Sequence, residues 1–176
     1  DSIDADTLCA AKNAIKQTIT SKILLIVISK SGSTTESIAN FQAVYRKGVN
    51  VVAISEKNSK LHQLAISKGF HFLEIPPSIS GRYSVFSNVG LFPLAVLGVD
   101  IQALLSGARK AALLCFSTNW KQNPALVMAA LLYLHHKKEK HLHESFFFAS
   151  NLETLGKWWR QLISESTGKE KNLSGK

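Results

Sequence analysis

The sequence predicts an α/β fold in which a parallel sheet is flanked by helices, and two observations support this class. Short apolar runs with the length of buried strands occur at residues 23–28, 51–55 and 70–75. Segments of about ten residues with helical periodicity separate them, which is typical of parallel βαβ units. The first element is a helix that no strand precedes, and the last is a helix that no closing strand follows. The predicted sheet domain is therefore incomplete at both ends.

The first elements follow from apolar spacing and from residues that cap helices. We expect a helix over residues 4–19 with Asp4 or Asp6 at its N-cap, because acidic residues there accept hydrogen bonds from free N–H groups. The apolar run at 23–28 then leads into a polar loop and a second helix that ends near Gly48.

The next elements repeat this order. After the second strand, Asn58 or Ser59 caps a helix that a lysine and Gly69 close, in the positions expected at a helix C-terminus. The third strand, at 70–75, ends where Pro76 and Pro77 interrupt the pattern.

The second half of the chain is mainly helical. Long apolar helical stretches are expected at 83–97, 100–115 and 123–136. A new strand at 145–150 and a helix at 152–166 come after them. A strand after so much helix indicates a second α/β unit, so we predict a division near residue 144. Residues 1–143 then form the first domain, and residues 144–176 begin the second.

Composition limits the class of partner. The 176 residues carry a formal net charge of +9, with 45% hydrophobic and 19% charged residues. The basic residues are dispersed, without an aromatic-basic stripe, so attraction of small phosphorylated anions explains the charge and no nucleic-acid partner is expected. No apolar run reaches the roughly 18 residues of a membrane span, and no signal peptide is visible, so no membrane partner is expected.

Cysteine and histidine usage favours neither disulfides nor metal. Cys9 and Cys115 lie far apart in helical contexts, so we expect reduced, buried thiols in a cytoplasmic protein. The segment HHKKEKHLH at 135–143 is rich in lysine, and no zinc-binding spacing accompanies it. We interpret it as a solvated helix end, and we expect no metal site.

The loop SKSGSTTES, residues 29–37, carries six hydroxyl groups in nine positions. Two interpretations remain open. Ser33 and Glu36 fit an S-x-x-E capping box, which satisfies N–H groups at the start of the next helix. An anion site explains more of the hydroxyls, because a helix start offers free N–H groups and a positive dipole. The loop matches neither a Walker A motif nor G-x-G-x-x-G, so a nucleotide is not expected.

Two further stretches carry polar groups with a chemical use. Gly81 and Arg82 follow the third strand, and this glycine permits either an unusual backbone conformation or the close approach of a ligand. Arg82 alone also fits a helix cap or an ion pair. Gln161 and Glu165 are four positions apart and share one helical face, which also describes an ordinary exposed surface pair.

Taken together, the three stretches resemble one family. SKSGSTTES, SGRYSVFSNVGLFPLAVLGVDIQALLSGA and GKWWRQLISESTGK occur in this order and at these separations in glucose-6-phosphate isomerases, the bacterial forms in particular. The resemblance covers essentially the whole chain, but family members are considerably longer on both sides. It implies a sugar isomerase domain with three layers, a sugar-phosphate substrate, no cofactor, a cytoplasmic location and a homodimer in the full-length protein.

The resemblance assigns the substrate phosphate to the hydroxyl-rich loop. Ser29, Lys30, Ser31 and Thr34 match the family residues that hold the phosphate, and Ser37 is a weaker match. These residues carry donors that a phosphate can use.

The same resemblance assigns the reacting groups. Gly81 and Arg82 match a pair beside the reacting carbons, Gln161 matches a substrate-contacting glutamine, and Glu165 matches the catalytic base. Ser80 departs from the family, in which a second glycine is usual, but it leaves Arg82 in register.

The implied reaction interconverts glucose 6-phosphate and fructose 6-phosphate through a cis-enediol. Three family elements have no match here: an upstream Gly-Ser loop with its strand, a histidine associated with ring opening, and a lysine near the C-terminus. We therefore expect this chain to be inactive alone. The alternative is a non-catalytic sugar-phosphate sensor, which would have no reason to keep both Arg82 and Glu165 in these positions.

Overall fold

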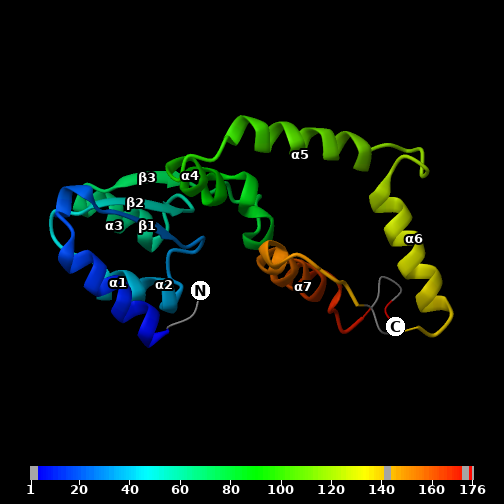
Figure 1. The fold of residues 1–176 in the computed structure, drawn as a ribbon, viewed down its shortest axis with the longest axis horizontal. Coiled ribbons are helices and arrows are strands. Elements are labelled where there is room, and N and C mark those ends of the chain that lie inside the picture. The colour runs from blue at the N-terminus through cyan, green and yellow to red at the C-terminus, as the bar shows by residue number, and fades with distance from the viewer. Residues whose placement is uncertain (1–3, 141–143, 172–174, 176) are drawn as a thin grey trace. The chain divides into compact units, whose positions relative to one another are not determined.

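The computed structural model of the chain describes residues 4–140, 144–171 and 175. The chain forms two compact units, residues 1–99 and 100–176. Figure 1 labels the helices and strands of both units. The sheet and almost all of the buried residues belong to the first unit.

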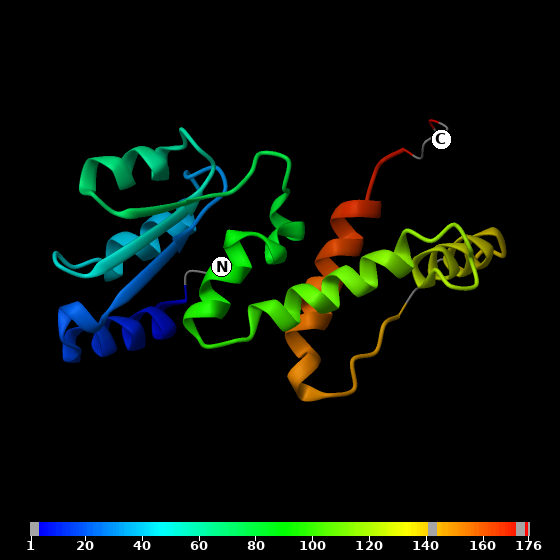
Figure 2. The same ribbon diagram turned by 90° about the horizontal axis from the view of Figure 1, so that it is seen from above.

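The first unit is built on the predicted parallel sheet. Its strands are β1 (Leu24–Ile28), β2 (Asn50–Ser55) and β3 (His71–Glu74), in the order β1-β2-β3. Both pairs are parallel, and Figure 2 shows the three strands side by side. All three predicted strands are confirmed to within one residue at each end.

Helices cover both faces of this sheet. The unit contains α1 (Ala5–Gln17), α2 (Thr35–Val44), α3 (Lys60–Lys68) and α4 (Asn88–Val96), with short 3₁₀ helices η1 (Thr20–Lys22) and η2 (Gly81–Phe86). On one face, Phe41 of α2 and Leu61 of α3 belong to a buried cluster with sheet residues, and Ile15 of α1 packs against it. On the other face, Val89 and Phe92 of α4 pack against β2 residues. The predicted three-layer arrangement is confirmed.

The structure shows which of the candidate residues cap α1 and α3. Asp4 is the N-cap of α1, and hydrogen bonds from Thr7 lower the pKa of its carboxyl group. Ser59 caps α3 by accepting from the His62 N–H, and Gly69 closes that helix with a left-handed backbone, φ 68°.

The expected end of α2 near Gly48 is wrong, because the helix ends at Val44. Tyr45 leaves the helix with an extended backbone, and its ring packs 5.3 Å from Phe41 and 5.7 Å from Phe70, measured between ring centroids. Arg46 then donates a hydrogen bond of 2.6 Å to the carbonyl of Ile15. Partial burial of the Tyr45 ring and this tertiary hydrogen bond favour the turn over another turn of helix.

Gly32 cannot be replaced without strain. Its φ is +67°, and a Cβ there would lie 2.6 Å from the main-chain nitrogen of Leu61. We expect Gly32→Ala to lower the free energy of unfolding by about 3 kcal/mol or more, since backbone strain and overlap add. Urea unfolding of the chain measures this loss.

Gly69 supplies a matched control for this substitution. Its φ of +68° is nearly the same, but nothing lies within 4 Å of the added Cβ. Gly69→Ala should therefore cost only the left-handed strain, about 1 kcal/mol. Equal losses in the two variants would show that the contact between Gly32 and α3 adds nothing.

The second unit contains the predicted long helices. They are α5 (Ile101–Cys115), α6 (Pro124–Lys137) and α7 (Glu153–Thr167), with the short 3₁₀ helix η3 (Ser150–Leu152) before α7. Asn123 opens α6 by accepting from the Leu126 N–H, while its amide nitrogen donates to the carbonyls of Cys115 and Ser117. Among the described residues of this unit, Asn123 alone is buried.

The expected strand at 145–150 is wrong. These residues form no strand, and they lie outside the sheet of β1–β3, as expected. A strand needs a neighbour, and none of the described residues pairs with this segment. Phe147 instead packs on Gly156 of α7, where an added Cβ would lie 2.9 Å from its ring, and Trp159 donates 3.0 Å to the hydroxyl of Ser145. The domain division near residue 144 stays a prediction.

The thiols are not buried as expected. Cys9 and Cys115 are free but exposed. His135 and His136 are exposed at the end of α6, whereas His141 and His143 lie outside the described residues. The described part of the chain contains no cluster of three or more side chains that could hold a metal ion.

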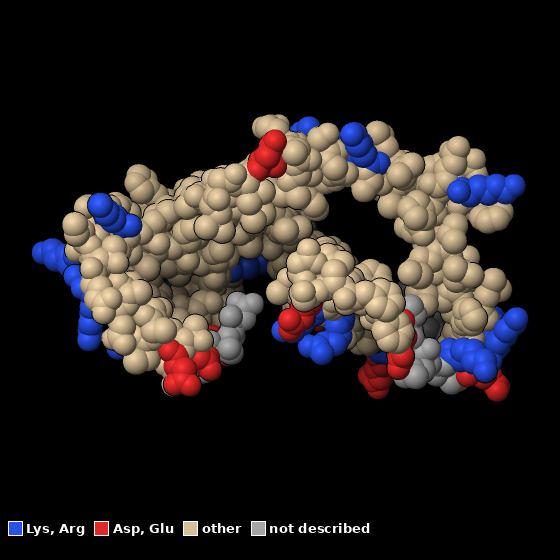
Figure 3. All heavy atoms as spheres, viewed as in Figure 1, with Lys and Arg blue, Asp and Glu red and all other residues tan. Residues whose placement is uncertain are grey.

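On the face drawn in Figure 3, lysine and arginine side chains stand at separate places and form no continuous patch. No helix among the described residues is long and apolar enough to cross a membrane.

Candidate functional site

Several predicted site residues follow the carboxyl ends of the three strands. Because the strands are parallel, these ends lie at one edge of the sheet. The loop 29–34 follows β1, Glu56 follows β2, and the segment 75–80 follows β3 and leads into η2. Loops at such an edge are where α/β sheets place their ligands.

Ser29 and Thr34 are brought together across the loop. Ser29 is buried, 5% exposed, and its N–H donates to the carbonyl of Ile54, which extends the ladder beyond β1. Its hydroxyl oxygen lies 2.9 Å from the Thr34 hydroxyl. Thr34 is the N-cap of α2 but caps no N–H with its side chain. Two hydroxyls therefore meet at the start of a helix, where free N–H groups can also bind an anion.

Ser31 has a different partner. Its hydroxyl accepts from the Ser33 N–H at 3.3 Å and from the Ser33 hydroxyl at 3.0 Å. The capping box of Ser33 with Glu36 is not formed, because the helix begins one residue later than that motif needs and Thr34 occupies the N-cap. Whether Ser31 joins Ser29 and Thr34 around an anion stays a prediction.

Lys30, in the loop after β1, contacts the loops that follow β2 and β3. Its ammonium nitrogen lies 3.4 Å from a carboxylate oxygen of Glu56 and donates to the carbonyl of Pro77 at 3.2 Å. The Glu56 N–H also donates to the carbonyl of Lys30. Sequence patterns do not reveal this contact, since the partners come from different loops.

Gly81 and Arg82 begin η2, and hydroxyls support this turn. Ser84 donates to the carbonyl of Gly81 and Ser87 donates to the carbonyl of Ser84, both at 2.6 Å. Both serines are buried. The half-buried Arg82 places its guanidinium 5.2 Å from the ring centroid of Tyr83. The sequence analysis does not predict that Ser84 and Ser87 support this turn. Their spacing from Gly81 is the feature of the sequence that could have indicated it.

The glycine at position 81 has no conformational need that the structure reveals. Its φ is not positive, so the unusual backbone conformation considered for it is absent. An added Cβ would meet nothing within 4 Å. The other interpretation, close approach of a ligand, stays open. The neighbouring Ser80 hydroxyl oxygen is buried and has no hydrogen-bond partner among the described residues.

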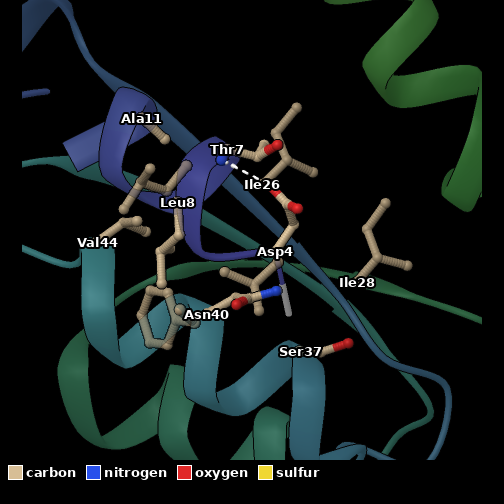
Figure 4. A pocket seen from close by; sticks show the side chains of 12 residues that line it. Asp4, Thr7, Leu8, Ala11, Ile26, Ile28, Ser37, Asn40 and Val44 are labelled. Carbon is tan, nitrogen blue, oxygen red and sulfur yellow. Dashed lines mark hydrogen bonds between the residues drawn. The ribbon is translucent and has the colours of Figure 1, made fainter. Parts of the chain in front are cut away.

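Ser37 occupies a different environment from the loop hydroxyls. It lines a cavity of about 420 Å³ between α1, β1 and α2 (Figure 4). Asp4 lines the same cavity, and its carboxylate disfavours a phosphate there. Ser29 and Thr34 do not line this cavity, so Ser37 has different neighbours from these two hydroxyls.

Gln161 and Glu165 share one face of α7, as their spacing predicts. The Gln161 amide donates 2.9 Å to a carboxylate oxygen of Glu165. Both side chains are exposed, and Lys169 donates to the main-chain carbonyl of Glu165. The Glu165 carboxylate thus accepts from the neutral amide of Gln161, and its side chain is exposed to solvent.

The comparison that identifies the family covers nearly all of the chain. The model of the phosphoglucose isomerase family matches residues 3–176. The chain belongs to the phosphoglucose isomerase family. Its sequence resemblance to glucose-6-phosphate isomerases is thereby confirmed, while the roles of the individual site residues stay predictions.

Individual relatives agree with this membership. The chain is 33% identical over 164 residues to a glucose-6-phosphate isomerase of Methanocaldococcus jannaschii, covering 90% of this chain and 41% of that protein. It is 36% identical over 178 residues to that of Mycoplasmopsis synoviae, covering 96% and 41%.

A solved structure has the same fold. The crystal structure of a hypothetical protein from Thermus thermophilus superimposes with a TM-score of 0.85 at 31% identity, covering 100% of this chain and 43% of that one. The chain thus spans about two fifths of the length of the phosphoglucose isomerase relatives that it matches.

Proposed function

We propose that these residues belong to an aldose–ketose isomerase that interconverts glucose 6-phosphate and fructose 6-phosphate in glycolysis and gluconeogenesis. The observation that carries the proposal is the family match across residues 3–176. The two hydroxyls that meet at the start of α2 and the accessible carboxylate of Glu165 support it. The full-length polypeptide is the family-length chain that carries these residues.

The reaction requires a proton to move between C1 and C2 of the open sugar. In the proposal Glu165 removes the C2 proton, and the cis-enediol that results is protonated again at C1. Negative charge develops on the sugar oxygens, and the guanidinium of Arg82 stabilises it without losing its own proton. The loop at Ser29 and Thr34 holds the phosphate, which orients the reacting carbons. Gln161 contacts the substrate beside Glu165.

Two properties of the full-length polypeptide belong to the same proposal. We assign it to the cytoplasm and to a homodimer, on the family resemblance alone. No cofactor and no metal enter the proposed reaction, because a carboxylate and a guanidinium supply its acid–base and electrostatic needs.

The alternative function is a sugar-phosphate sensor, and one assay separates the two. The full-length polypeptide should interconvert glucose 6-phosphate and fructose 6-phosphate. The assay starts from fructose 6-phosphate and measures the glucose 6-phosphate that forms through its coupled oxidation. A sensor would bind the sugar phosphate, seen by calorimetry, without converting it. Binding without turnover would overturn the proposed function.

The present chain alone should have negligible isomerase activity. The resemblance implies a histidine associated with ring opening and a lysine near the C-terminus, and neither has a match among these 176 residues. We expect weak binding of inorganic phosphate, detectable by NMR shifts of the amides in loop 29–34, and no conversion in the coupled assay. Robust turnover by this chain would show that the unmatched histidine and lysine are unnecessary.

A further inference from the structure

The side chain of Lys30 is already engaged within the protein. Its ammonium lies 3.4 Å from the Glu56 carboxylate and 3.2 Å from the Pro77 carbonyl oxygen that accepts its hydrogen bond. The side chains of the ion pair are 34% and 32% exposed, so both groups are partly shielded from water. An ammonium has three donors, and one of them is hydrogen-bonded to the Pro77 carbonyl.

Neutralisation by Glu56 changes what Lys30 offers to an anion. A lysine beside a carboxylate at this distance presents a dipole and little net charge to a third group. The hydroxyls of Ser29 and Thr34 lie in the same loop and carry no opposing charge. Phosphate attraction is therefore better supplied by the hydroxyls and the start of α2 than by the Lys30 ammonium.

The contact with Pro77 explains what the ammonium does. Pro76 and Pro77 have no N–H group, so the segment after β3 has few ways to donate to its neighbours. The Pro77 carbonyl instead accepts a hydrogen bond from Lys30 and so attaches this segment to the loop that follows β1. The same segment continues directly into Gly81 and Arg82 at the start of η2.

We propose that Lys30 is a positioning residue, whose side chain fixes the segment 75–80, and through it Arg82, against the loop that follows β1. This inference rests on the proposed function, and it replaces direct phosphate binding by the Lys30 side chain. Arg82 acts where charge develops, so a small displacement of its turn lowers turnover more than it weakens ground-state binding.

The test compares Lys30→Met, Lys30→Arg and Glu56→Ala in the full-length polypeptide. We measure kcat and KM for glucose 6-phosphate and the inhibition constant of inorganic phosphate. Lys30→Met should lower kcat by about 10- to 100-fold with KM and phosphate inhibition nearly unchanged. Lys30→Arg should restore most of kcat, because a guanidinium also donates to a carboxylate and a carbonyl.

Glu56→Ala distinguishes a positioning role of Lys30 from a phosphate-binding role. A positioning role predicts a lower kcat, because the Lys30 side chain loses one of the two partners that hold it. If Lys30 is only a phosphate ligand, releasing its ammonium from Glu56 should tighten phosphate inhibition and leave kcat unchanged. Lys47→Met, at an exposed lysine before β2, is the matched control and should leave kcat unchanged.

Three results would overturn the inference. The first is Lys30→Met weakening phosphate inhibition while kcat holds. The second is tighter phosphate inhibition in Glu56→Ala with kcat unchanged. The third is no change in kcat for either variant. An inactive wild-type polypeptide would instead overturn the proposed function itself. If Lys30→Met fails to fold, Glu56→Ala still decides between the two roles.

Discussion

Replacing Glu165 by glutamine in the full-length polypeptide is expected to lower kcat by about 10²- to 10⁴-fold, because an amide cannot accept the C2 proton. Inorganic phosphate should inhibit the variant with the same inhibition constant as the wild type. The phosphate loop belongs to the first unit, and Glu165 belongs to α7 of the second. Steady-state kinetics with glucose 6-phosphate and phosphate measure both quantities.

The substitution removes the proton acceptor and keeps the size of the side chain. Glutamine has the shape of glutamate, and its amide oxygen can still accept from the Gln161 nitrogen that now lies 2.9 Å away. Glu153→Gln is the matched control, since Glu153 is another exposed carboxylate of α7 and Lys157 lowers its pKa. The control should keep wild-type kcat. Turnover of Glu165→Gln close to that of the control would remove Glu165 from the role of base.

Replacing Arg82 by alanine should lower kcat by about 10²- to 10³-fold, which is typical when one charge-stabilising donor is lost from a transition state. The enediol carries its developing charge only briefly, so KM should change much less than kcat. The half-buried guanidinium belongs to a turn that Ser84 and Ser87 hold through the Gly81 and Ser84 carbonyls. The turn itself should therefore survive the substitution.

Two variants sharpen this result. Arg82→Lys keeps the charge but loses the planar fork, so it should recover only part of the activity. Arg109→Ala removes an exposed arginine of α5 and should leave kcat unchanged. A large rise in KM for Arg82→Ala with unchanged kcat would mean that Arg82 binds the ground state and has no special role in the enediol.

Local patterns predicted the elements of the first unit well. Apolar runs predict all three strands, and Asp4 and Ser59 are each one of two candidate caps, because these signals depend on a few neighbouring residues. The end of α2 was missed because the contacts of Tyr45 with Phe41 and Phe70 decide it, and Phe70 is distant in sequence.

Strand pairing and loop contacts were beyond local patterns. Residues 145–150 have the composition of a strand, but pairing requires a partner that no local signal supplies, and Phe147 packs on α7 instead. The contact of Lys30 with Glu56 and Pro77 joins three loops, so spacing along the chain does not reveal it.

The candidate site was found by resemblance more than by spacing. Spacing alone placed Gln161 and Glu165 on one face, which their hydrogen bond bears out. It left the hydroxyl loop divided between a capping box and an anion site. The structure removes the capping box, because Thr34 and not Ser33 is the N-cap of α2.

Proton exchange at C2 tests the central claim most directly. Glucose 6-phosphate is turned over many times in D₂O by the full-length polypeptide, and NMR follows deuterium at C2 of the recovered substrate. A carboxylate that carries the proton exchanges it with solvent in some turnovers, so deuterium should accumulate with the wild type and not with Glu165→Gln. Sustained conversion by the wild type without any deuterium at C2 would contradict proton transfer through Glu165.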